Sequence, residues 1–459
     1  MSNSKTLTCF KAYDVRGKLG EELNEEIAYR IGRATAQSLN ANTIVLGFDA
    51  RATSPNLARS LARGICHAGA DVLNIGLTGT EEMYAAVSEF GACAGIEVTA
   101  SHNPINYNGM KIVKHCSQPL TDQEFSNIKQ LAEQNNPILS NHSGLVIDKR
   151  SAARNTYIEK IIDLVDLQSL QPLKIVINSG NGAAGPTIDV LKQKMEEKGI
   201  ITNFVYVHHD PDPSFPNGIP NPMLAENRSA TADVVISEEA DFGVAFDGDF
   251  DRCFLFDQGG NFIPGEYVLG LLTKVFLRKE RGATIVHDPR VIWNTIDVVS
   301  KCGGRAVSSK TGHSFVKAAM RENGAIYGGE ISAHHYFRDF AYCDSGMIPW
   351  LMIWELISKS NLFLSDLILE RKQRFPSSGE INFTVADPEN CLEMVNSLFA
   401  SGATSIDELD GLSMCFENWR FNLRKSNTEP LVRLNIETRG DQFLLREKTK
   451  IFKKIMKNA

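Results

Sequence analysis

Short apolar runs rich in β-branched residues recur along the chain, and each ends in polar residues. They cover residues 43–51 (TIVLGFDAR), 173–185 (LKIVINSGNGAAG) and 283–290 (ATIVHDPR). Runs of this length bounded by turn residues are typical of buried strands. A helical pattern follows each run, such as NLARSLARGICHAGA after the first. This alternation predicts α/β units with parallel strands.

Each predicted helix leads to a second strand that ends in an unusual polar segment. These segments read LTGTEEMY, AFDGDFDR and YGGEISAHHYF. The recurrence predicts three related α/β domains laid end to end, each with a loop at the carboxyl edge of its sheet. Residues 208–227 carry five prolines and are expected to form a long loop.

The alternation of predicted strands and helices ends at residues 375–383 (FPSSGEINF). Two strand-rich segments, GLSMCFENWRFNLR and LVRLNIETR, and then a basic helix follow, which predicts a C-terminal α+β domain. We therefore expect an α/β protein of three consecutive domains with mixed sheets plus this fourth domain, around a central cleft. The expected domains are residues 1–150, 151–255, 256–370 and 371–459.

Composition and charge narrow the function classes. The 459 residues are 43% hydrophobic and 22% charged, as in ordinary soluble proteins. The net charge of −7 argues against a nucleic-acid surface. The nine cysteines form no C-x-x-C pair, and no apolar run approaches membrane-spanning length. We expect a protein of the reducing cytoplasm, with no membrane and no obligate protein partner.

The segment AFDGDFDRC is a candidate metal site, because Asp247, Asp249 and Asp251 stand at alternate positions. In an extended segment these carboxylates would point the same way, and a few hard oxygen ligands favour Mg²⁺. An EF-hand is excluded, since Arg252 takes its glycine position and Gln258 its glutamate position. A solvated acidic turn is the simpler alternative. It is disfavoured by three phenylalanines that frame the segment: Phe246, Phe250 and Phe254.

The segment TASHNP places Ser101 and His102 just beyond a predicted strand end. Asn103-Pro104 and Asn108-Gly109 are turn dipeptides, so the pair is expected on a loop. Such loops hold the chemistry of many α/β proteins, although a chance pair on a solvated turn is common.

Four further segments offer groups for an anionic or sugar ligand. The turn RKSNTEP supplies a compact set of phosphate donors, and TGHS stands before a helical pattern. The loop GGEISAHHYF and the opening KAYDVRG add carboxylate, hydroxyl, aromatic and cationic groups. Each segment taken alone is also compatible with a surface turn, an N-cap or an edge strand. The candidate residues are Tyr13, Arg16, His313, Glu330, Ser332, His334, Arg424, Ser426, Asn427 and Thr428.

Together these motifs resemble those of the α-D-phosphohexomutases. TASHNP, DGDFDR, GGEISAH and RKSNTEP occur in that family's order, and the opening FKAYDVRG also matches. The resemblance spans about residues 10–439. Within the family the chain is most similar to bacterial phosphomannomutases, on the runs FKAYDVRGKLGEELNE, INSGNGAAGP and RDFAYCDSGMIPW.

The resemblance implies a phosphoserine enzyme. Ser101 would carry a phosphoryl group, pass it to a hexose phosphate, and regain one from a hexose 1,6-bisphosphate intermediate, which also serves as the activator. Asp247, Asp249 and Asp251 would hold Mg²⁺ together with an oxygen of phospho-Ser101, and Arg252 would add positive charge. His102 and Lys111 are both candidates for the proton acceptor.

The same resemblance implies which residues bind the sugar phosphate. Its distant phosphate would be bound by Arg424, Ser426, Asn427 and Thr428, and Glu330 and Ser332 would hold ring hydroxyls. The product, mannose 1-phosphate, would supply GDP-mannose synthesis. Two positions depart from many relatives: Ala333 replaces glycine, and Arg290 replaces the lysine of some dual-specificity enzymes.

Three alternatives remain open. A mutase with dual specificity for mannose and glucose phosphates would use the same contacts, since the two sugars differ only at C2. A sugar-phosphate-binding protein without catalysis would keep its function without Ser101. A phosphatase would release inorganic phosphate steadily.

Overall fold

The computed structural model describes residues 6–134, 140, 142–425 and 431–457, and these form two compact units. The first unit comprises Met1–Phe262 and Asp339–Ser360. The second comprises Ile263–Arg338 and Asn361–Ala459. The chain therefore enters the second unit, returns to the first for one short segment, and ends in the second.

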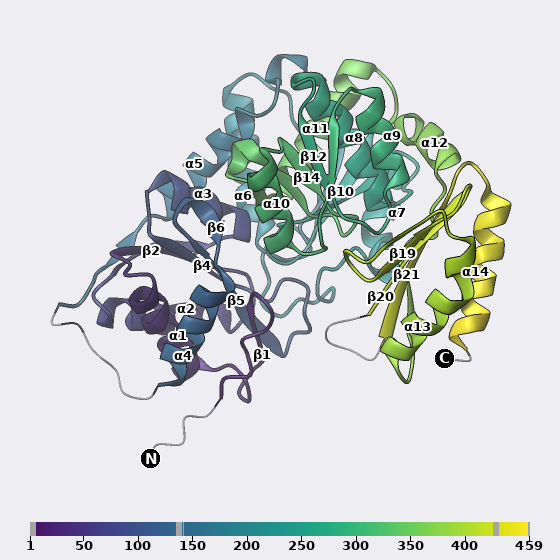
Figure 1. The fold of residues 1–459 in the computed structure, drawn as a ribbon. Helices are drawn as coiled ribbons and strands as arrows, with labels where there is room; N and C mark the ends of the chain where they lie inside the picture. The colour runs from purple at the N-terminus through teal and green to yellow at the C-terminus, as the bar shows by residue number, and fades with distance from the viewer. Residues whose placement is uncertain (1–5, 135–139, 141, 426–430, 458–459) are drawn as a thin grey trace. The chain divides into compact units, whose positions relative to one another are not determined.

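The first sheet of the first unit has the strand order β1-β5-β4-β2-β3-β7. Strand β2 runs parallel to β3 and β4, whereas β5 is antiparallel to β4. Helices α1, α2 and α4 pack on one face, and α3 packs with α5 on the other (Figure 1). The elements are β1 (Val15–Lys18), α1 (Glu25–Ser38), β2 (Thr43–Phe48), α2 (Ser54–His67), β3 (Asp71–Leu77), α3 (Thr80–Glu89), β4 (Ala94–Val98), β5 (Tyr107–Lys114), β6 (Gln118–Pro119), α4 (Asp122–Glu133), β7 (Val146–Asp148) and α5 (Arg150–Ile162).

Local sequence explains where these helices begin. Asn24 caps α1, because its side chain accepts a hydrogen bond from the Ile27 N–H at 3.0 Å. Thr121 and Glu124 form a reciprocal capping box at the start of α4. Both devices satisfy backbone donors that the first helical turn leaves without partners.

The second sheet of the first unit has the order β11-β10-β8-β9. Its elements are β8 (Lys174–Asn178), α6 (Ala184–Glu197), β9 (Asn203–Val207), α7 (Ser229–Ser237), β10 (Phe242–Phe246) and β11 (Cys253–Asp257). Residues 208–224 form the expected long loop. Helix α11 (Met347–Ser360) also belongs to this unit, and its Trp350 and Trp354 rings pack edge-on against Phe204 of β9.

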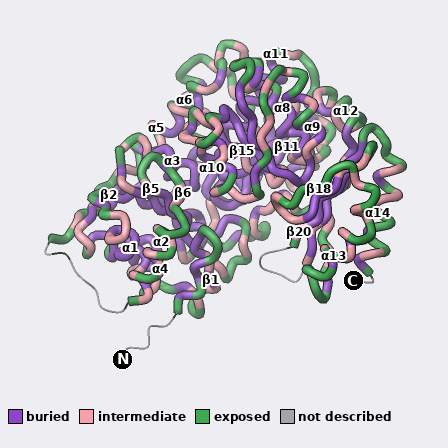
Figure 2. Tube along the Cα trace, viewed as in Figure 1, coloured by how far each residue is buried: buried purple, intermediate pink, exposed green. Residues whose placement is uncertain are grey.

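The second unit begins with a sheet in which β13, β12, β14 and β15 lie side by side. Strands β12, β14 and β15 are buried, the edge strand β13 is partly exposed, and the helices expose their outer faces (Figure 2). The elements are α8 (Gly265–Lys279), β12 (Thr284–His287), α9 (Trp293–Lys301), β13 (Arg305–Ser308), α10 (His313–Asn323), β14 (Tyr327–Gly329) and β15 (His335–Phe337).

The unit ends in an antiparallel sheet of order β17-β21-β20-β19-β18, with α13 and α14 against it (Figure 1). The Phe399 and Phe452 rings of the two helices stack at 5.2 Å over the core. The elements are α12 (Leu364–Arg374), β17 (Ile381–Thr384), α13 (Pro388–Phe399), β18 (Ser405–Asp407), β19 (Leu412–Cys415), β20 (Trp419–Lys425), β21 (Leu431–Thr438) and α14 (Gln442–Met456). The predicted fold class of three α/β domains and one α+β domain is confirmed.

The three α/β sheets share one topology, but one predicted correspondence is wrong. In each sheet the first strand lies between the second and the third, and a fourth strand pairs antiparallel with the third. TASHNP, DGDFDR and GGEISAH follow the third strands β4, β10 and β14, whereas LTGTEEMY follows the second strand β3. The sequence pattern missed the second strands β9 and β13: β13 (RAVS) has no clear apolar run, and the run FVYV of β9 was left unassigned.

Candidate active site

The loop after β4 presents Ser101 at a strained position. Ser101 is 5% exposed and has φ of +48°, in the left-handed region. Its N–H donates to the Thr99 hydroxyl at 2.8 Å. Non-glycine residues hold this conformation only where their surroundings impose it. The prediction that Ser101 lies on a loop beyond a strand end agrees with the structure.

Arg51 is the main support of this loop. Its guanidinium donates to four backbone carbonyls of the loop, those of Ser101, Asn103, Pro104 and Tyr107. The Ser101 contact is 2.9 Å, and Asp49 lies 3.5 Å from Arg51 Nε. One buried side chain thus holds the loop from Ser101 to Tyr107.

Asp247, Asp249 and Asp251 converge in the turn between β10 and β11. One carboxylate oxygen of each lies within 4.8 Å of the others, and all three side chains are buried. The expected reason for the convergence is wrong: the segment is a turn with φ of +44° at Phe250, and not an extended strand. The three framing phenylalanines are buried as predicted.

This donor set fits Mg²⁺. Carboxylate oxygens are its preferred protein ligands. Asp249 Oδ1 is buried and has no hydrogen-bond partner among the described residues. A cation ligated by the three carboxylates would satisfy that oxygen and reduce the repulsion between them.

The serine and the aspartates meet directly. The Ser101 hydroxyl donates to Asp247 Oδ2 at 2.7 Å, although 146 residues separate the two in sequence. Arg252 Nε donates to the same Asp247 oxygen at 2.9 Å, and Arg252 Nη2 lies 3.2 Å from Ser101 Oγ. We call Ser101, His102, Lys111, Asp247, Asp249, Asp251 and Arg252 the serine–aspartate cluster.

His102 and Lys111 occupy different electrostatic settings within this cluster. His102 Nδ1 lies 3.2 Å from Ser101 Oγ and accepts a hydrogen bond from Arg252, whose positive charge lowers the pKa of His102 well below its usual value. Lys111 Nζ contacts Asp251 and lies 2.7 Å from Asp249. Burial opposes the charge on Lys111, but the two aspartates raise its pKa above the ordinary value.

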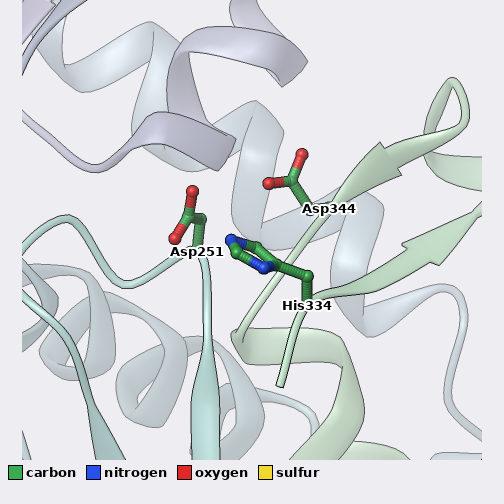
Figure 3. A group of neighbouring side chains, drawn as sticks. All are labelled: Asp251, His334 and Asp344. Atoms are coloured by element: carbon green, nitrogen blue, oxygen red, sulfur yellow. The ribbon is translucent and has the colours of Figure 1, made fainter. Parts of the chain in front are cut away.

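A further carboxylate, Asp344 of β16 (Cys343–Asp344), lies beside the cluster. An oxygen of Asp344 lies within 4.8 Å of an oxygen of Asp251 (Figure 3). Burial and the neighbouring carboxylates, with Asp249 first among them, raise the pKa of Asp251 well above its ordinary value. The negative charge here exceeds what Lys111 and Arg252 neutralise.

Close backbone contacts hold the aspartate turn against its neighbours. A Cβ on Gly248 would lie 2.7 Å from the Ser101 carbonyl oxygen, so this approach requires glycine. The Ala183 N–H at the start of α6 donates to the Gly248 carbonyl at 3.1 Å. The Thr80 N–H donates to the Asp249 carbonyl at 3.2 Å, and the Thr80 hydroxyl donates to the Asp249 carboxylate.

Arg16 contacts the serine loop in the first unit, and Tyr13 lies three residues before Arg16 in the sequence. Arg16 Nη1 donates to the Thr99 carbonyl at 2.8 Å, and its other nitrogen is 3.9 Å from Asp14. Tyr13 is 41% exposed, so its ring is accessible to a ligand.

In the second unit, the loop between β14 and β15 presents Glu330, Ser332 and His334. Glu330 is 1% exposed and accepts from the Gly312 N–H at 2.8 Å and from the Tyr336 hydroxyl at 2.6 Å. His334 Nδ1 lies 3.4 Å from Ser332 Oγ and 3.6 Å from Glu330. Ala333 has φ of +68°, so alanine here adopts the backbone conformation that glycine would take without strain.

Residues of α10 and β20 complete the predicted set. TGHS lies at the start of α10, as predicted, with His313 as its first helical residue. Arg424 lies on β20, is largely buried, and pairs with Glu380 at 3.0 Å. Ser426, Asn427 and Thr428 lie outside the described residues.

Arg290 lies between Glu330 and Glu380, the carboxylate that pairs with Arg424. Its guanidinium lies 2.7 Å from Asp288, 3.9 Å from Glu330 and 3.6 Å from Glu380. We call Arg290, Glu330, Glu380, Arg424 and Arg433 the arginine–glutamate cluster.

Sequence reasoning missed Arg51, Thr80 and Glu380. A signal for Arg51 existed: D-A-R after β2 and D-P-R after β12 repeat one local motif, in which the aspartate accepts from the arginine N–H at 3.0 and 2.9 Å. Thr80 and Glu380 act through contacts with residues distant in sequence, which no local pattern marks.

Comparisons with known proteins identify the family. Sequence models of phosphoglucomutase/phosphomannomutase match four consecutive segments: alpha/beta/alpha domain I at residues 8–138, domain II at 155–260, domain III at 264–375, and the C-terminal domain at 380–454. The chain belongs to the phosphoglucomutase/phosphomannomutase family. The predicted membership is thereby confirmed.

Several members of this family are similar over their whole length. A phosphomannomutase of Escherichia coli K12 is 53% identical over 449 residues, covering 97% of this chain and 98% of the relative. A phosphomannomutase of Vibrio cholerae is 51% identical, covering 99% of each. The crystal structure of a phosphoglucomutase/phosphomannomutase family protein from Burkholderia thailandensis aligns with a TM-score of 0.86 at 30% identity, covering 100% of this chain and 98% of that one.

The sequence also carried expectations about membrane spans and about disulfides. Within them no helix is long and apolar enough to cross a bilayer. None of the nine cysteines forms a disulfide there, in line with the absence of a C-x-x-C pair.

Proposed function

We propose that this chain is a phosphomannomutase, an intramolecular phosphotransferase that interconverts mannose 6-phosphate and mannose 1-phosphate. The relatives at 51–53% identity over nearly the whole chain carry that name. The observation that carries the proposal is the Ser101 hydroxyl, 2.7 Å from Asp247 in the serine–aspartate cluster. The dual-specificity alternative is not favoured by these relatives.

The reaction begins with a phosphoryl group on Ser101 Oγ. The free hydroxyl of a hexose phosphate attacks phosphorus and gives its proton to a basic group, while the bond to Oγ breaks and Oγ takes up a proton to become the serine hydroxyl. The product is a hexose 1,6-bisphosphate, which turns over and returns its other phosphoryl group to Ser101. Catalysis of such a transfer is mostly positioning and neutralisation of charge.

The serine–aspartate cluster would supply both the positioning and the positive charge that this transfer needs. Asp247, Asp249 and Asp251 would hold Mg²⁺, which when bound supplies positive charge to the phosphoryl oxygens. Arg252 orients Ser101 Oγ by its 3.2 Å contact and adds a second positive charge. His102 and Lys111 both lie within this cluster and are the two candidates for proton transfer.

The residues of the second unit would bind the substrate. Glu330 already accepts two protein hydrogen bonds, but each carboxylate oxygen retains a lone pair for a sugar hydroxyl, and Ser332 offers another group. Arg424 with Ser426, Asn427 and Thr428 would bind the distant phosphate. Arg290, His313, His334, Tyr13 and Arg16 would add charge and hydrogen bonds at other points of the ligand.

The remaining expectations belong to the same proposal. Hexose 1,6-bisphosphate would restore the phosphoryl group whenever Ser101 loses it. The product would serve GDP-mannose synthesis in the cytoplasm. The division into domains 1–150, 151–255, 256–370 and 371–459 assigns one of the four family motifs to each domain.

The test is ³¹P NMR of the protein with Mg²⁺ and a trace of hexose 1,6-bisphosphate, with mannose 1-phosphate and glucose 1-phosphate in parallel tubes. The mannose signal should move to the 6-phosphate position much faster than the glucose signal. Ser101→Ala should abolish the conversion. Comparable rates would favour dual specificity, release of inorganic phosphate alone would indicate a phosphatase, and no change would leave a binding protein.

A further inference from the structure

Glu380 lies at the centre of the arginine–glutamate cluster, in the segment before β17. Its carboxylate is 3.0 Å from Arg424 Nη2, 3.4 Å from Arg433 Nη1 and 3.6 Å from Arg290 Nη1. The three arginines come from β20, β21 and the loop after β12. One carboxylate therefore contacts three guanidinium groups from separate elements.

The charges of the cluster are not balanced evenly. Arg290 has two further acidic partners, Asp288 at 2.7 Å and Glu330 at 3.9 Å. Arg424 and Arg433 have no acidic partner other than Glu380 among the described residues. The Nε atoms of both are buried and without a hydrogen-bond partner in that part of the chain. The three arginines are matched in number by Asp288, Glu330 and Glu380, but Arg424 and Arg433 share a single carboxylate and keep unused donors.

Electrostatics keep Glu380 ionised and make it important to Arg424. Burial would raise the pKa of Glu380, but Arg290 and Arg424 hold it below its ordinary value. Burial and the nearby Arg290 lower the pKa of Arg424, and Glu380 opposes that effect. Without an anion at this point the two guanidinium groups would repel each other.

We propose that Glu380 is an internal counter-ion, which occupies Arg424 when the site is empty and which the phosphate group of the substrate displaces. This rests on the proposed function, which assigns Arg424 to phosphate binding. A phosphate dianion presents three acceptor oxygens and can use the Arg424 donors that the carboxylate leaves unused. When the phosphate group leaves, the carboxylate returns and prevents repulsion between the arginines.

This exchange matters to a mutase because its intermediate has to release one phosphate group and present the other. A cluster of arginines without a counter-ion would bind each phosphate more tightly and release it more slowly. Glu380 therefore acts as a positioning residue that lowers phosphate affinity and speeds the turnover of the intermediate.

The test compares Glu380→Gln with a matched control. Glutamine keeps the size and one acceptor oxygen but removes the charge. Glu389→Gln is the control, because Glu389 pairs with Lys425, the next residue after Arg424, but is exposed. The dissociation constant of inorganic phosphate, by calorimetry, should fall by about tenfold in Glu380→Gln, as expected for removing a charge a few ångströms from an anion. It should not change in Glu389→Gln.

Kinetic measurements distinguish a counter-ion role of Glu380 from a purely structural role. In Glu380→Gln both KM for mannose 1-phosphate and kcat should fall. A rise in KM, or an unchanged phosphate dissociation constant, would overturn the inference. Glu380→Asp keeps the charge and withdraws it by one methylene, so it should tighten phosphate binding to a smaller degree. Should the glutamine variant fail to fold, unchanged or weaker binding in the aspartate variant would overturn the inference equally.

A third variant distinguishes this inference from the proposed function. Arg424→Gln should weaken phosphate binding strongly. If it does so and Glu380→Gln does not bind phosphate more tightly, only the counter-ion inference is wrong. If Arg424→Gln binds phosphate as the unchanged protein does, the assigned phosphate site is wrong, and the counter-ion inference falls with it.

Discussion

Replacement of Arg51 by methionine should damage both the stability and the activity of the enzyme. Arg51 is 2% exposed and donates to four carbonyls of the loop that carries Ser101. Methionine fills much of the same volume but donates nothing. It would leave the buried Asp49 without its cation and the Ser101 carbonyl without its donor.

The size of the effect follows from these contacts. Removing one partner of a buried ion pair costs about 3–5 kcal/mol, and the carbonyl contacts that reach solvent add little to this. The left-handed conformation of Ser101, with φ of +48°, costs about 1–3 kcal/mol and needs support from its surroundings. Without Arg51 the loop should relax and move Ser101 Oγ from Asp247. A displacement of about 1 Å is enough to reduce kcat by about 100-fold.

The assay is the mannose 1-phosphate conversion rate together with the thermal unfolding midpoint. Arg51→Lys should lie between the unchanged enzyme and Arg51→Met, because lysine keeps the charge near Asp49 but loses the forked donors. Arg59→Met on the exposed face of α2 is the control and should change neither quantity. Full kcat and an unchanged midpoint in Arg51→Met would refute the assignment of loop support to this side chain.

Three other predictions follow from the first unit. Gly248→Ala should reduce kcat by at least 100-fold, because the new Cβ would lie 2.7 Å from the Ser101 carbonyl, whereas Gly402→Ala, whose Cβ meets nothing closer than 3.7 Å, should leave kcat unchanged. Burial raises the pKa of Glu81 to about 8, so the folded state binds an extra proton and stability should fall as pH rises from about 4.5 to 8. Glu81→Gln keeps the acceptor for the Gly346 N–H and should abolish this slope, so equal pH profiles of the two midpoints would contradict the buried carboxyl. Asp249→Asn should weaken Mg²⁺ binding measured by calorimetry by at least tenfold, and an unchanged affinity would remove Asp249 from the ligand set.

Much of this fold could be predicted because the first and third strands of each sheet are buried. TIVLGF, KIVIN and TIVH are almost continuous apolar runs, and β2, β8 and β12 occupy them. Buried parallel strands have this composition because helices cover both faces of the sheet. Strands β9 and β13 both lie at sheet edges with partly exposed residues; β13 (RAVS) carries no comparable signal, whereas β9 has the apolar run FVYV, which the sequence pattern left unassigned.

The chemistry of the candidate site was visible in short motifs, but its geometry was not. The three aspartates converge through a turn that depends on Phe250 in the left-handed region, which an alternating pattern does not reveal. The contacts of Ser101 with Asp247 and of Lys111 with Asp249 join residues 146 and 138 positions apart. Such pairs arise only when segments of separate sheets come together in the folded chain, which no single motif encodes.

The return of the chain to its first unit has a consequence for synthesis on the ribosome. Phe204 of β9 is covered by Trp350 and Trp354 of α11, and the Trp354 indole N–H donates to the Gln171 carbonyl at 2.7 Å. These tryptophans are translated about 150 residues after Phe204, a delay of roughly 8–30 s at ordinary elongation rates. During that interval the nascent second domain has an uncovered aromatic face, so chaperone demand during translation should concentrate there.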